Sequence, residues 1–93
     1  MGYEYSVQIK GKTQNSNIVE SIYKSFKEVD LLKNAQLEGN RIEVPEIWMT
    51  LSKESENEIY YSISADAGDR ELVNRTISMA LSKLRIDFIC EEE

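Results

Sequence analysis

The side chains of this 93-residue chain that could do chemistry are carboxylates, aromatic rings and one thiol, because histidine is absent. Acid–base catalysis near neutral pH most often uses histidine. Cys90 has no histidine to activate it, and the following Glu91–Glu93 disfavour a thiolate. We therefore expect Cys90 to be a buried structural residue. None of the 17 acidic residues has a spacing that singles out a catalytic pair. The sequence predicts that the protein is not an enzyme.

Three carboxylates, Asp66, Asp69 and Glu71, cluster before a segment with helical periodicity. An EF-hand needs alternating oxygen ligands and a distant bidentate glutamate, and this spacing provides neither. Asp69 as the helix cap and Glu71 in the first helical turn explain the cluster without a metal. We therefore expect no metal ion and no other cofactor.

Hydrophobic periodicity predicts the elements that position these groups, in the order strand, helix, strand, strand, helix, strand. Alternation of period two indicates a strand, and an apolar stripe of period 3.6 indicates a helix. Strands are expected at 3–10, 41–51, 58–65 and 85–90, and helices from a cap at Asn17 to about residue 32 and from Asp69 to Leu84. This order predicts a single α+β domain over residues 1–93. We expect a ferredoxin-like β-α-β-β-α-β sandwich, with a four-stranded antiparallel sheet in the order 4-1-3-2 and both helices on one face.

Two features of the middle of the chain leave alternatives open. Gly39-Asn40 is a turn signal, so residues 35–38 form either a short extra strand or a loop. Pro45 lies inside the expected strand 41–51, at the point where the apolar alternation reverses. A bulge at Pro45-Glu46 would return the apolar residues on both sides of it to the core.

The sheet face turned away from the helices carries the candidate binding residues. Pairing strands 41–51 and 58–65 about residue 54 places Trp48 opposite Tyr60 on that face. Apolar anchors surrounded by carboxylates are typical of an interface for a basic protein. We expect the aromatic pair to be the anchor, extended by Ile89. The predicted partners of lysine and arginine side chains on the same face are Glu4, Glu46, Glu58 and Asp87.

The net charge of −6 is unevenly distributed. Residues 1–42 carry six basic and five acidic side chains, whereas residues 43–93 carry five basic and twelve acidic ones. This balance opposes binding to nucleic acid or to an anionic membrane surface and favours a basic protein, although it also serves solubility. No apolar run approaches the roughly 20 residues of a membrane span. The single cysteine favours a reducing, cytoplasmic setting.

These observations predict a small acidic binding protein that covers a basic protein surface. Bacterial immunity proteins, which cover the active-site cleft of a cationic nuclease toxin, are the nearest functional analogy. The analogy rests on size, charge and the lack of catalytic groups, and on no motif. The alternative is a homo-oligomeric regulatory domain, in which the open sheet face packs on a second copy and a small ligand binds between them.

Overall fold

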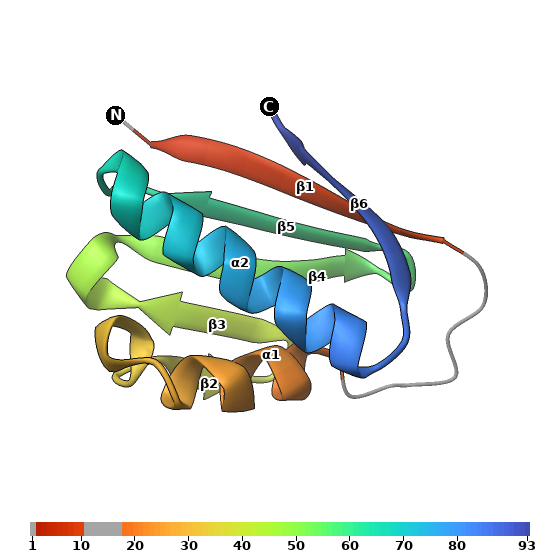
Figure 1. Ribbon diagram of the computed structural model, residues 1–93, viewed down its shortest axis with the longest axis horizontal. Helices are drawn as coiled ribbons and strands as arrows, with labels where there is room; N and C mark the ends of the chain where they lie inside the picture. The colour runs from red at the N-terminus through yellow and green to blue at the C-terminus, as the bar shows by residue number, and fades with distance from the viewer. Residues whose placement is uncertain (1, 11–17) are drawn as a thin grey trace.

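In the computed structural model, which describes residues 2–10 and 18–93, two helices pack on one face of an antiparallel sheet (Figure 1). The described residues form six strands, in the order β2-β3-β4-β5-β1-β6 across the sheet. The elements are β1 (Tyr3–Lys10), α1 (Ile18–Lys27), β2 (Gln36–Glu38), β3 (Arg41–Val44), β4 (Met49–Ser55), β5 (Glu58–Ile63), α2 (Ala67–Lys83) and β6 (Asp87–Glu92), with 3₁₀ turns η1 (Asp30–Leu32) and η2 (Pro45–Ile47).

The α+β class is confirmed, but the expected count of four strands is wrong. Of the two alternatives for residues 35–38, the short extra strand is confirmed: residues 36–38 form β2, because Gly39 adopts a φ of +61° and closes a hairpin onto β3. The expected strand 41–51 is divided into β3 and β4, which pair with each other. The neighbour order β6-β1-β5-β4 nevertheless matches the expected order 4-1-3-2, since β1, β4, β5 and β6 overlap the first, second, third and fourth expected strands.

A hairpin turn that begins at Pro45 divides the expected strand into β3 and β4. The bulge expected at Pro45-Glu46 is wrong. Pro45 begins η2, where its fixed φ is favourable and its missing N–H leaves no bond unmade. Trp48 ends the turn with φ 50° and ψ 41°, and its N–H donates to the Pro45 carbonyl at 3.2 Å. The chain then reverses, so Val44 pairs with Met49. The reversal explains why the apolar residues on the two sides of Pro45 have opposite parity and still share the core face.

The core lies between the sheet and the two helices. One stripe of α1 (Ile18, Val19, Ile22, Phe26) and one of α2 (Val73, Ile77, Ala80, Leu81) are buried against the inward residues of the strands. Tyr61 is completely buried and stacks on Tyr5 with ring centroids 5.0 Å apart. Its hydroxyl donates to Asn74 Oδ1 at 2.7 Å, and burial raises the pKa of this hydroxyl far above its usual value.

The ends of several elements differ from expectation: α1 ends at Lys27 and not near residue 32, and β6 is Asp87–Glu92 and not 85–90. The cap of α2 is Asp66, whose Oδ1 accepts the Asp69 N–H at 2.9 Å, so the helix begins before Asp69. Cys90 is exposed and not buried. It pairs with Val7 on the core side, but β6 is the last strand of the sheet and, among the described residues, has a neighbouring strand on one side only. The expected cap at Asn17 lies outside the described residues.

Candidate functional site

The sheet face turned away from the helices is defined by the pairing register, since directly opposite residues of antiparallel strands point to the same side. One row across it runs Thr50, Ser62, Glu4, and the next runs Ser52, Tyr60, Ser6, Glu91. We call this surface the acidic sheet face. Its charged residues within the strands are Glu4, Lys10, Glu38, Arg41, Glu43, Glu54, Glu58, Asp87 and Glu91.

The acidic sheet face and the two helices differ in the charge that they carry. The acidic sheet face carries seven acidic and two basic side chains, a balance of −5 within a chain of net charge −6. The helices α1 and α2 together carry three acidic and five basic side chains, a balance of +2. The sheet side is therefore the surface that a cationic molecule would approach.

Tyr60 and Glu4 form the hydrogen-bonded centre of the acidic sheet face. The Tyr60 hydroxyl donates to Glu4 Oε1 at 2.5 Å. This hydrogen bond, together with partial desolvation and the charges of Glu4, Glu93 and Glu54, raises the pKa of Tyr60 to about 12. Tyr60 therefore stays a neutral donor at physiological pH, and it holds one carboxylate in a fixed orientation.

The neighbouring carboxylates are also held by side-chain contacts. Gln8 Nε2 donates to Glu58 Oε2 at 2.8 Å and also contacts Ser6 Oγ at 3.2 Å. On β3, on the same face, Arg41 and Glu43 form an ion pair of 3.0 Å. Part of the negative charge is thus presented on oriented groups that the sheet fixes in place.

The structure brings together five of the seven residues that the sequence analysis selected. Glu4, Tyr60, Glu58, Asp87 and Ile89 all lie on the acidic sheet face. Glu4 and Tyr60 are in contact, and Ile89 pairs with Gln8 beside Glu58.

Trp48 and Glu46 do not lie where the sequence analysis placed them. Tyr60 pairs with Ser52, so the expected Trp48–Tyr60 pair is wrong. The carbonyl of Ile47, the residue before Trp48, accepts the Ser64 N–H at 3.2 Å, which puts the backbone at this point about 13 Å along the strand from Tyr60. Glu46 lies on η2 and accepts a hydrogen bond from Asn34 Nδ2 at 3.1 Å. Both residues lie elsewhere than expected because the chain turns at Pro45.

Trp48 nevertheless adjoins the acidic sheet face at one corner. The indole is 77% exposed and lines a shallow groove of about 270 Å³. The other lining residues are Glu43, Pro45, Met49 and Thr50. Glu43 and Thr50 also belong to the acidic sheet face, because they pair with each other in the row of Glu4. The groove therefore opens at the border of that face.

Several acidic residues of this face were missed by the sequence analysis. Glu43 could have been found, because the inward parity of Ile42 and Val44 turns Arg41 and Glu43 outward. Glu54 could not, since it lies at a register shift between Lys53 and Ser55 that no sequence pattern marks.

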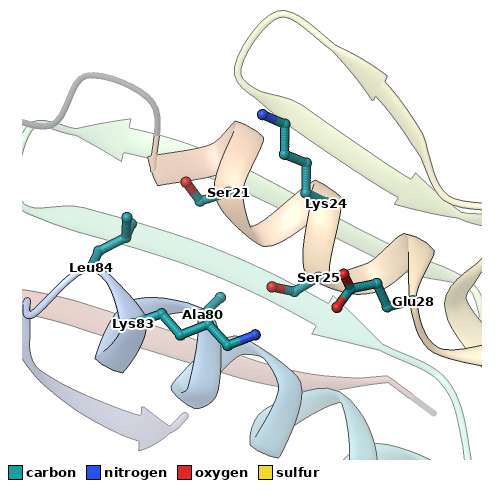
Figure 2. A pocket seen from close by; sticks show the side chains of 7 residues that line it. All are labelled: Ser21, Lys24, Ser25, Glu28, Ala80, Lys83 and Leu84. Atoms are coloured by element: carbon teal, nitrogen blue, oxygen red, sulfur yellow. The ribbon is translucent and has the colours of Figure 1, made fainter.

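The helix side carries a second depression, between α1 and α2 (Figure 2). Its volume is about 240 Å³, and its lining residues are Ser21, Lys24, Ser25, Glu28, Ala80, Lys83 and Leu84. Small-molecule sites typically enclose about 300–1,000 Å³ and bury most of their ligand. This depression lies on the side opposite the acidic sheet face and is smaller than such a site.

Comparison with known proteins found no relative of this chain. No protein-family model matches it, and no similar protein was found among curated proteins or solved structures. No helix among the described residues is long and apolar enough to cross a membrane. Within those residues, cysteine and carboxylate side chains also form no group of three that could hold a metal ion.

Proposed function

We propose that this protein binds a basic partner protein through the acidic sheet face and so covers a cationic surface of that partner. The observation that carries the proposal is the charge division, −5 on the acidic sheet face against +2 on the helices. A field of this kind orients an approaching cationic protein before contact and raises its association rate.

The contacts on this face supply specificity once the partner has arrived. Glu4 and Glu58 are held by Tyr60 and Gln8, so they lose little freedom when they accept hydrogen bonds from lysine or arginine. Ile89 is 41% exposed and offers an apolar contact near the second of these carboxylates. Trp48 extends the contact area at the corner of the face.

We extend this proposal to the fold family and to the biological role of the protein. The neighbour order β6-β1-β5-β4, with both helices on one face, supports a ferredoxin-like sheet to which the β2–β3 hairpin has been added. A cationic nuclease toxin is the kind of partner that fits, because a surface that binds phosphates also attracts these carboxylates. In this proposal the protein is a non-enzymatic inhibitor of the bacterial immunity type and acts in the cytoplasm.

The homo-oligomeric alternative has weaker physical support. Stacking two acidic sheet faces would bring seven carboxylates of one copy against seven of the other, and like charges oppose such a contact. The depression between α1 and α2 lies on the opposite side and would not be enclosed by that dimer.

Two variants of equal net charge test the proposal. The face variant carries Glu4→Gln, Glu54→Gln and Glu58→Gln. The helix-side control carries Glu20→Gln, Glu28→Gln and Glu71→Gln. Each has a net charge of about −3, against −6 in the unmodified chain. Circular dichroism first establishes that both variants fold.

The assay is affinity capture from the source cell's lysate, followed by mass spectrometry. We expect one basic protein in stoichiometric amount, retained at about 0.15 M salt and weakened at about 1 M. The helix-side control should capture it and the face variant should not. Equal capture by the two variants would remove the site assignment, and recovery of the protein alone would favour self-association.

A further inference from the structure

The two edges of the sheet differ in how much backbone they leave unpaired. The edge strand β2 has three residues, whereas the opposite edge, β6, has six. β6 pairs with β1 on one side (Figure 1). No strand among the described residues pairs with its other side. The outer edge of β6 is therefore the longer stretch of unpaired strand in the described part of the sheet.

The register identifies which backbone groups point outward from this edge. The Glu93 N–H donates to the Glu4 carbonyl at 2.8 Å, so residues of this parity in β6 direct their N–H and C=O groups towards β1. In an antiparallel pair this direction alternates. The backbone groups of Phe88, Cys90 and Glu92 therefore point away from the sheet, in the direction from which a further strand would pair.

The charge along this edge selects against a second copy of the same strand. Natural proteins protect open edges with charged residues, prolines or bulges. Residues 87–93 contain four carboxylates, no proline and no basic side chain. An antiparallel pair of two β6 strands centred on Cys90 would bring eight carboxylates together, with Asp87 opposite Glu93. A segment rich in lysine or arginine would instead be attracted by these carboxylates.

The side chains of the edge add apolar contacts on both sides of such a strand. Ile89 is 41% exposed on the acidic sheet face, whereas Phe88 is half-buried and packs against the core on the other side. Alternating contacts of this kind give side-chain specificity when a strand is added to a sheet.

We propose that the outer edge of β6 receives an extended, basic segment of the partner as an added strand. This inference rests on the proposed function and names the part of the partner that is bound. Main-chain hydrogen bonds to Phe88, Cys90 and Glu92 provide the attachment. Basic side chains of the added strand face Asp87, Glu91 and Glu93.

The test uses amide hydrogen exchange, measured by NMR on the full chain. The probe is a short peptide of alternating lysine and valine, added at millimolar concentration. The control peptide has the same composition and charge except that its central valines are replaced by proline, which cannot donate to a ladder. We expect the alternating peptide to slow exchange at Phe88, Cys90 and Glu92 about tenfold near saturation, and the control peptide to leave it unchanged.

A pair of variants at one position gives a second measurement. Cys90→Pro removes an outward N–H, whereas Cys90→Ala keeps it. Provided that the spectrum of the proline variant shows a folded protein, it should lose the chemical-shift response to the alternating peptide while the alanine variant retains it.

The outcomes separate this inference from the proposed function. Shifts at Tyr60 and Glu58 without protection of the β6 amides would overturn the added strand and leave the acidic sheet face as a binding surface. No response at either place would overturn the added strand and also count against the proposed function.

Discussion

Replacing Trp48 by glycine should leave the stability of the fold almost unchanged, although tryptophan is the largest side chain in the protein. The residue has φ 50° and ψ 41°, a conformation that costs a residue with a Cβ about 1–2 kcal/mol and glycine almost nothing. The indole is 77% exposed, so removing it loses little burial. The fold therefore gains from relieved strain about as much as it loses in packing.

The two contributions can be estimated separately. A fully buried aromatic side chain removes about 150–250 Å² from water, so the buried quarter of Trp48 contributes about 1 kcal/mol. Trp48→Ala loses this packing and keeps the strain, and should be less stable than the unmodified protein by about 1 kcal/mol. Glycine relieves the strain and costs about 0.5–1 kcal/mol in chain entropy, so it should exceed alanine in stability by about 0.5–1 kcal/mol.

The assay is urea denaturation followed by far-ultraviolet circular dichroism, because both variants lack the only tryptophan. The control is the same pair of substitutions at Thr50 in β4, where glycine should be the less stable of the two. A glycine variant less stable than alanine at position 48 would refute the backbone argument. If Trp48 is a binding anchor, both substitutions should also weaken partner binding by about 2 kcal/mol, and an unchanged affinity would remove it from the interface.

Three further predictions follow from the core, the acidic sheet face and the second helix. Phe26→Ala should lower the unfolding free energy by about 3–5 kcal/mol, because this side chain is completely buried; a loss below about 1 kcal/mol in urea denaturation would contradict the packing. Tyr60 should titrate with a pKa of about 12, and Glu4→Gln should move that pKa towards 10. The measurement is the ultraviolet absorbance change with pH, and Tyr60→Phe identifies the part of it that comes from Tyr60. The same pKa of Tyr60 in the unmodified protein and in Glu4→Gln would exclude the hydrogen bond. The folded protein holds this proton more tightly than the unfolded chain, so the stabilisation is complete below pH 10 and is lost as the pH rises through 12. Asp66→Ala should cost about 1 kcal/mol in thermal or urea unfolding through the lost cap on the Asp69 N–H, whereas Asp66→Asn should restore most of it.

Local periodicity was sufficient to predict the existence and order of the two helices and of the strands that flank them, but not where α1 ends, where α2 begins or which residues bound β6. The alternation of Tyr5, Val7 and Ile9 and the apolar stripe of α1 follow from burial on one side, which any single element with one buried face shows. The alternation of side chains along β1 and β5 then placed Glu4, Glu58 and Tyr60 correctly on the acidic sheet face.

What the sequence could not decide was how the chain passes Pro45. A bulge and a hairpin both return Val44 and Met49 to the core, so the apolar pattern is equally compatible with either. The two differ in the register of β4 against β5, and therefore in whether Trp48 faces Tyr60. Cys90 shows a related limit, because parity gives the direction of a side chain but not whether a helix covers the edge of the sheet there.

The most direct test of the central claim is the association rate of the captured basic partner with the two variants of equal net charge, measured on a biosensor at low and high salt. At low salt the face variant should associate about tenfold more slowly than the unmodified protein, the helix-side control should change less than about twofold, and high salt should bring the three rates together. Equal slowing of the two variants would mean that total charge and not the acidic sheet face directs binding, and would contradict the account.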